Sequence, residues 1–171
     1  MRRPPRRLSR SGRGRPGPEQ AGDPATIRRA ALGLLSRRDF ATTELVGKLL
    51  GQGYAEGPAE EVVAELAAER LLDDERYAAN YVAWHAGRGQ GPLRIRQDLL
   101  ATGLPGERVA QALDSGPDFT ALCRQTRARR FGVELPADLK ERARQARFLQ
   151  YRGFSADHIR SAFGPDFDPE E

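Results

Sequence analysis

The stretch Leu149-Gln-Tyr-Arg-Gly-Phe-Ser155 decides the fold, because its glycine followed by an apolar residue occurs at two earlier, evenly spaced places. The three glycines lie 50 residues apart: Gly53, Gly103 and Gly153. A glycine in the left-handed conformation closes a helix, and the apolar residue after it packs back on the last turn. Recurrence of this signal at a fixed period predicts an array of structural repeats.

Between these glycines, apolar residues recur with the spacing of helices. Side chains at i, i+3, i+4, i+7 and i+8 form one helical face, as in Ile27, Ala30, Ala31, Leu34 and Leu35. A short apolar helix also follows each glycine, at Val62–Leu66, Val109–Leu113 and Ile159–Phe163. A unit of this size cannot bury its apolar faces well by itself. We therefore predict an all-α fold of three tandem three-helix repeats, nine helices in an elongated, slightly curved array.

The same pattern predicts how the chain is divided. We expect the repeats at residues 25–72, 73–116 and 117–164, with an acidic C-terminal end at 165–171. Residues 1–24 are rich in Arg, Pro and Gly and hold too few apolar side chains to offset the entropy of ordering. We predict a disordered tail there, either without a role or acting as an arm that touches phosphates or an acidic partner.

Three residues are expected to begin helices. Pro58 suits the first turn of a helix because its φ is already helical. Asp73 and Ser155 have the short polar side chains that cap a helix N-terminus.

The net charge of +4 arises in the first residues of the chain. Residues 1–18 hold seven arginines and no acid, which leaves 21 basic and 24 acidic groups in the other 153 residues, a net of −3. A nearly neutral body weakens the argument from high isoelectric point to nucleic-acid binding. The single Cys123 excludes an internal disulfide framework and a cysteine zinc site. A lone thiol, and no apolar run of membrane-spanning or signal-peptide type, predict a cytoplasmic protein.

Three segments resemble the motifs of a known family. Leu34-Leu-Ser-Arg-Arg-Asp-Phe-Ala-Thr-Thr-Glu-Leu45 with Lys48-Leu49 resembles the opening motif of the RecX family. Leu72-Asp-Asp-Glu-Arg-Tyr-Ala78, followed by Tyr81-Val82, Gly89-x-Gly91, Arg94-Ile95 and Leu99, resembles its central motif. Leu149-x-x-x-Gly-Phe-Ser155 with Asp157 and Ile159 resembles its C-terminal motif. The resemblance covers about residues 26 to 164.

The resemblance implies a regulator of the RecA recombinase, built of three three-helix repeats. Members of the family lie in the groove of the RecA–single-stranded-DNA filament and lower its ATPase, strand-exchange and co-protease activities. A monomer that modulates recombinational repair and the SOS response is therefore expected. Ala41 stands where the family often carries a capping serine, and we expect Thr42 to cap that helix instead.

The candidate binding residues are basic side chains in the second and third repeats. Residues 117–163 hold ten basic and five acidic groups, a net of +5. A face of guanidinium groups suits phosphates or carboxylates, and the alternative is a solvated face with pairs inside each helix. Two more arginines follow the Gly87–Gly91 loop, where backbone amides either hold a phosphate or belong to a flexible connector. The predicted filament- or DNA-binding residues are Arg94, Arg96, Arg124, Arg127, Arg130, Lys140, Arg144 and Arg147.

Other candidate chemistry is weak. Asp73, Asp74 and Glu75 are expected to be caps and dipole partners rather than metal ligands, and no cofactor is expected. The two histidines lie far apart and no catalytic motif is present, so we do not expect an enzyme. Tyr81 and Trp84 either stack a nucleic-acid base or pack between repeats.

Two other functions compete with filament regulation. The first is a tandem helix-turn-helix protein that binds duplex DNA directly. Residues 58–70 argue against it, because that third helix is acidic and would repel phosphates. The second is a helical scaffold for unrelated protein partners, whose basic side chains only keep it soluble.

Overall fold

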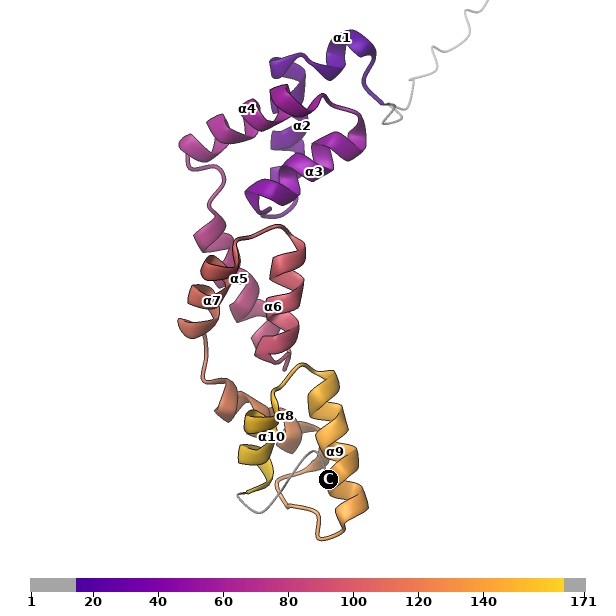
Figure 1. Cartoon of the computed structure of the whole chain (residues 1–171), viewed down its shortest axis with the longest axis vertical. Helices are drawn as coiled ribbons and strands as arrows, with labels where there is room; N and C mark the ends of the chain where they lie inside the picture. Colours follow the sequence, from indigo (N-terminus) through magenta and orange to yellow (C-terminus); the bar gives the residue numbers. More distant parts are fainter. Residues whose placement is uncertain (1–14, 165–171) are drawn as a thin grey trace, which may run out of the picture.

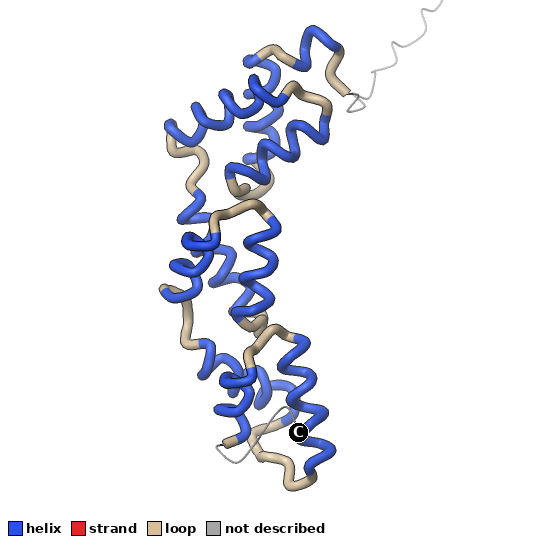
Figure 2. The backbone as a smooth tube through the Cα atoms, in the orientation of Figure 1, coloured by secondary structure: helices blue, strands red, loops and turns tan. Residues whose placement is uncertain are grey.

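The computed structural model describes residues 15–164, and this part of the chain is entirely helical apart from loops and turns. Ten helices run along it in three groups stacked end to end, which gives a long, curved body (Figures 1 and 2). The predicted all-α repeat array is confirmed, although a tenth helix, α1, precedes the nine that were predicted. The helices are α1 Pro18–Ala21, α2 Pro24–Leu35, α3 Thr42–Gln52, α4 Glu56–Ala68, α5 Asp74–Gly87, α6 Pro92–Ala101, α7 Gly106–Asp114, α8 Phe119–Phe131, α9 Leu139–Tyr151 and α10 Ala156–Phe163.

The repeated glycines end α3, α6 and α9, which are the second helices of the three predicted repeats; α1 precedes the first repeat. Gly53, Gly103 and Gly153 have φ values of 98°, 86° and 88°, a region that a side chain with a Cβ rarely adopts. The Phe154 N–H donates to the Leu149 carbonyl at 3.1 Å, which is the long hydrogen bond of the Schellman arrangement. Helix closure by these glycines therefore turns the chain toward the third helix of each group.

Each group of helices has a core of its own. One buried cluster runs from Ile27 to Leu72, a second is centred on α5, α6 and α7, and a third lies among α8, α9 and α10. The second cluster also includes Ala41 from before α3 and Phe119 from α8. The groups are therefore separate in their centres but share apolar contacts where they meet.

The start of the described chain differs from the expectation. Residues 1–14 and 165–171 lie outside the described residues, so most of the predicted tail and the acidic end do too. Residues 18–21, however, form α1, which has Pro18 at its first position. The Ala55 N–H donates to the Ala21 carbonyl at 2.8 Å, which ties α1 to the start of α4. The prediction of disorder up to residue 24 is therefore wrong for this helix.

The helix starts agree only in part with the sequence. Asp73 and Ser155 cap α5 and α10, as expected. Pro58 does not open α4, which begins two residues earlier at Glu56. Pro58 lies in the first turn, where its missing N–H breaks no helical hydrogen bond.

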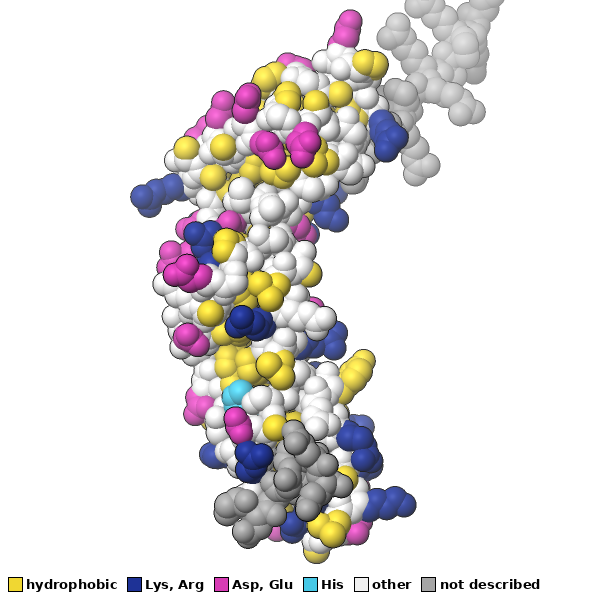
Figure 3. Space-filling view, viewed as in Figure 1, with side chains coloured by type: hydrophobic (Ala, Val, Ile, Leu, Met, Phe, Trp, Pro, Cys, Tyr) yellow, Lys and Arg dark blue, Asp and Glu magenta, His cyan; other side chains and the backbone are white. Residues whose placement is uncertain are grey.

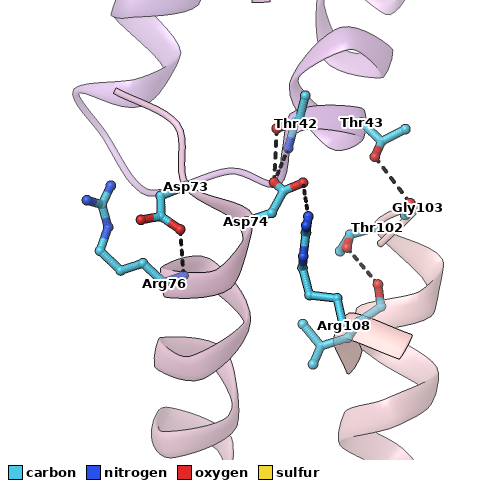
Figure 4. Close-up of polar contacts among 9 residues, drawn as sticks. Thr42, Thr43, Asp73, Asp74, Arg76, Thr102, Gly103 and Arg108 are labelled. Carbon is cyan, nitrogen blue, oxygen red and sulfur yellow. Dashed lines mark hydrogen bonds and ion pairs between the residues drawn. The ribbon is translucent and has the colours of Figure 1, made fainter. Parts of the chain in front are cut away.

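The N-terminus of α3 is capped by the following repeat (Figure 4). Asp74 Oδ1 accepts hydrogen bonds from the Thr42 N–H at 2.7 Å and from Thr42 Oγ1 at 3.0 Å. Arg108 Nη1 holds the other carboxylate oxygen at 3.2 Å. The expectation that the Thr42 side chain would cap this helix is wrong, because the helix begins at Thr42 and a carboxylate from α5 takes that role.

The second helices of the three groups meet head to tail. The Gly91 and Leu93 N–H groups at the start of α6 donate to the Arg152 and Gly153 carbonyls at the end of α9, at 2.8 and 3.0 Å. At the other end of α6, Thr43 Oγ1 of α3 donates to the Gly103 carbonyl at 3.2 Å. Carbonyls at the end of one helix thus accept from backbone N–H groups at the α6–α9 joint and from the Thr43 hydroxyl at the α3–α6 joint, and the head-to-tail arrangement aligns the helix dipoles.

We expect Gly91→Ala to open the joint between α6 and α9. Gly91 has an ordinary φ of −83°, but a Cβ there would lie 2.3 Å from the Gly153 backbone. Overpacking of this kind costs about 1–3 kcal/mol, which urea unfolding followed by circular dichroism would measure. Gly87→Ala is the control, because a Cβ at that exposed helical position meets nothing within 4 Å. Equal stability of the two variants would contradict the close contact.

Candidate nucleic-acid interface

Charge is separated across the long axis of the protein. In Figure 3 the Lys and Arg side chains gather along the edge formed by α6 and α9, whereas Asp and Glu dominate the edge formed by α4, α5 and α7. Helix α9 carries four basic residues and one acid, and α4 carries four acids and no base. This basic edge runs along α6 and α9. The backbone contacts that place these two helices end to end therefore also align their charges.

On α9, the predicted residues Lys140, Arg144 and Arg147 are all exposed. Arg144 is nevertheless engaged within its own helix, because its Nε and Nη2 lie 2.7 and 2.8 Å from the two carboxylate oxygens of Glu141. Hydrogen bonds from Arg144 and Gln145 lower the pKa of Glu141 to about 2 and that carboxylate raises the pKa of Arg144. Lys140 and Arg147 form no ion pair with any residue of the described part, so they are the free cations of this helix.

The three α8 arginines do not form one solvent face. Arg127 is only 4% exposed, and its Nη2 donates to the Val133 carbonyl at 2.7 Å while its Nη1 donates to Glu134 O and Gln145 Oε1 at 3.2 Å each. Burial lowers the pKa of its guanidinium. The prediction of Arg127 as a binding residue does not fit this placement, because the side chain anchors the loop between α8 and α9.

Arg124 and Arg130 remain at the surface. Arg124 donates to the Ser161 carbonyl from Nε at 3.2 Å and to Ser161 Oγ from Nη2 at 2.5 Å, which fixes α8 to α10. Arg130 lies 5.9 Å from the centre of the Phe131 ring. Arg129, which is not among the predicted binding residues, is also exposed. The sequence feature that could have identified Arg129 is its position next to Arg130 in a helix that contains no acidic residue.

On α6, Arg94 and Arg96 point to different surroundings. The Arg94 Cβ packs against Gly153, and its guanidinium lies 4.0 Å from Asp98. Arg96 is exposed and forms no ion pair within the described residues. The amides expected to hold a phosphate at this helix start already donate to carbonyls of α9, so that reading of the Gly87–Gly91 loop is wrong.

The remaining polar groups have structural roles. Asp73 accepts from the Arg76 N–H at 2.9 Å, which is the expected cap. The described residues contain no group of three His, Cys, Asp or Glu able to hold a metal ion. Burial raises the pKa of the Cys123 thiol to about 12, which keeps it protonated and unreactive. No helix within residues 15–164 is long and apolar enough to span a membrane.

Known proteins resemble this chain over most of its length. Family models described as "RecX, second three-helix domain" and "RecX, third three-helix domain" match residues 73–113 and 118–163. The regulatory protein RecX of Halorhodospira halophila is 44% identical over 137 residues, which cover 80% of this chain and 85% of that protein. The regulatory protein RecX of Ectopseudomonas mendocina is 43% identical over 80% of this chain and 92% of its own length.

Solved structures agree on the fold. A crystal structure of regulatory protein RecX aligns with a TM-score of 0.69 at 25% identity, and covers 84% of this chain and 73% of that one. The crystal structure of RecX from Lactobacillus salivarius aligns with a TM-score of 0.71 at 24% identity, over 83% of this chain and 95% of that one.

We expect Arg127→Ala to destabilise the protein by about 1–3 kcal/mol, because Gln145 and two carbonyls would lose their donor and a cavity would form. Thermal unfolding would measure the loss. Arg129→Ala on the same helix is exposed and should change stability by less than about 0.5 kcal/mol. Similar melting temperatures for the two variants would show that Arg127 does not anchor the loop.

The pairing of Arg144 has a signature in the titration of Glu141. Because the folded pKa of Glu141 is lowered to about 2, its pairing stabilises the fold above the ordinary carboxyl pKa and is lost as pH falls toward 2. Arg144→Ala should raise the Glu141 pKa toward its ordinary range in a carboxyl NMR titration. Arg147→Ala should leave it unchanged, and an equal rise in both variants would contradict a specific pair.

Proposed function

This chain belongs to the RecX family, and we propose on that premise that it binds the RecA–single-stranded-DNA filament and inhibits it. The inhibited activities are ATP hydrolysis, strand exchange and co-protease action, so the protein modulates recombinational repair and the SOS response. It acts as a cytoplasmic monomer, by binding, without a catalytic step or a cofactor. Its curated relatives are named regulatory proteins, which agrees with a role of this kind.

The observation that carries this proposal is the basic edge along an elongated body (Figure 3). A nucleoprotein filament is a long polyanion, and a row of cations on a rigid scaffold matches it over several contacts at once. The free cations on the two helices of this edge are Arg96 on α6 and Lys140 and Arg147 on α9, and Arg129 and Arg130 at the end of α8 are further exposed cations of the third repeat. Arg94 on α6 and Arg144 on α9 belong to the same two helices but are paired within the protein, and Arg124 on α8 is bound to Ser161 of α10.

Direct reading of duplex DNA by tandem helix-turn-helix units receives less support. Such units place a basic recognition helix in the major groove. The third helices here do not have that charge: α4 carries four acids, and α7 carries Glu107 and Asp114 against Arg108. Arg108 is moreover paired with Asp74 at the joint between repeats.

The test is the inhibition of ATP hydrolysis by RecA on single-stranded DNA. We expect Lys140→Glu/Arg147→Glu to need about tenfold or more protein than the wild type for half inhibition, because two attractive contacts become repulsive. Arg29→Glu/Arg76→Glu, which reverses two exposed arginines on α2 and α5, is matched in charge and should inhibit like the wild type.

The outcomes separate the proposal from its alternatives. Equal loss in both double variants would show that net charge matters and the basic edge does not. A wild-type protein that leaves the ATPase unchanged while binding duplex DNA would favour the helix-turn-helix reading. Binding to neither would leave a helical scaffold for other proteins.

A further inference from the structure

An aromatic pocket lies on α5, next to the loop that joins α2 and α3. It has a volume of about 380 Å³ and is lined by Arg38, Asp39, Tyr77, Asn80, Tyr81, Trp84 and His85. We propose that this pocket binds an unstacked nucleobase of single-stranded DNA. The inference extends the proposed function, since the filament supplies such a strand, and it concerns residues outside the basic edge.

The rings of the pocket form two walls. The Tyr81 and His85 rings are stacked, with centroids 4.0 Å apart and planes 22° from parallel. The Trp84 ring meets His85 edge-on at 4.6 Å and 68°. A flat base can therefore lie on one ring while its edge meets another, which is how aromatic side chains hold bases of single strands.

Trp84 is the most exposed ring of this site, with the Arg88 guanidinium over one of its faces. Its side chain is 56% exposed, so packing between repeats, the other role considered for it, is not what it does. Tyr81 is half-buried, and Tyr77 beneath it, with its ring centroid 6.1 Å away, is only 8% exposed. Tyr77 and Tyr81 are thus held in the fold, whereas Trp84 forms the solvent-exposed aromatic side of the pocket.

The pocket is also held in shape before any ligand arrives. His85 Nδ1 lies 2.5 Å from Gln90 Oε1, which fixes the orientation of the imidazole. Arg38 is held by both carboxylate oxygens of Glu44, at 3.0 and 2.6 Å. Side chains that are already ordered lose little entropy on binding, which favours affinity.

Its polar groups suit a nucleotide. The Arg88 guanidinium lies 3.2 Å from the centre of the Trp84 ring and forms no ion pair with any residue from 15 to 164, so it is free to meet a phosphate beside a stacked base. The Asn80 amide offers a donor and an acceptor to a base edge, and the Asp39 carboxylate accepts from an exocyclic amine. Aromatic grooves also bind proline-rich peptides, but such a peptide has no use for an unpaired cation and base-like polar partners.

The experiment uses Trp84 itself, which is the only tryptophan of the chain. Oligodeoxycytidylate of about ten nucleotides, added to the full-length protein without recombinase, should quench its fluorescence to saturation. An abasic oligonucleotide of the same length and charge should quench it far less, because only the base stacks. The variant test uses fluorescence anisotropy of a labelled oligodeoxycytidylate.

In that assay Trp84→Ala should weaken binding about fivefold to a hundredfold, the range expected for loss of one base–aromatic stack. Trp84→Phe should keep most of the affinity, since a ring remains. Tyr151→Ala is the matched control, because Tyr151 is an exposed aromatic residue on α9 and lies outside the pocket. Circular dichroism would confirm that the helices persist in each variant.

Three results would overturn the inference: equal quenching by the abasic strand, unchanged affinity of Trp84→Ala, or displacement of the oligonucleotide by a proline-rich peptide that itself quenches Trp84. Failure here is distinct from failure of the proposed function. A protein that inhibits RecA but does not hold a base in this pocket would leave filament binding by the basic edge intact.

Discussion

The end-to-end contact between the second helices of neighbouring repeats, α3, α6 and α9, positions the rest of the structure. The C-terminal carbonyls of α9 accept hydrogen bonds from the first N–H groups of α6. A Cβ at Gly91 would clash with the Gly153 backbone, and one at Gly153 would clash with Arg94, so neither position has room for a side chain. Each glycine therefore serves two purposes, since Gly153 ends its helix in the left-handed region and also lets the next helix reach its carbonyl. Because α6 and α9 are aligned in this way, their exposed cations fall along one edge.

The two joints in this column use different chemistry. At the joint of α6 with α9 the contacts are backbone to backbone, so they depend on little except the absence of side chains. At the joint of α3 with α6 side chains also make the contacts, because the Asp74 carboxylate caps the N-terminus of α3 and is itself held by Arg108. The joint of α6 with α9 thus depends mainly on glycine, whereas the joint of α3 with α6 adds side-chain contacts to a glycine, Gly103, that has no room for a Cβ beside Thr43.

Arginine has opposite roles within one repeat. Arg127 is buried and binds carbonyls of a loop, Arg124 ties two helices together, and Arg144 is paired with Glu141. Lys140 and Arg147 are free of such contacts and remain available to an external anion. The net positive charge of the third repeat is therefore larger than the number of cations that are available to a partner. The aromatic pocket on α5 uses a different kind of interaction, which is stacking of rings.

The sequence by itself determined the helices that follow α1, their grouping into three repeats and the glycines that end the second helix of each, because these depend on local periodicity and on the conformational freedom of glycine. It also determined the Asp73 and Ser155 caps, which are local hydrogen bonds. Only the tertiary structure decided the cap of α3 by Asp74, the burial of Arg127 and the exposure of Trp84. Spacing along a helix shows which side chains share a face, but whether that face meets water or another helix depends on residues that are distant in the chain.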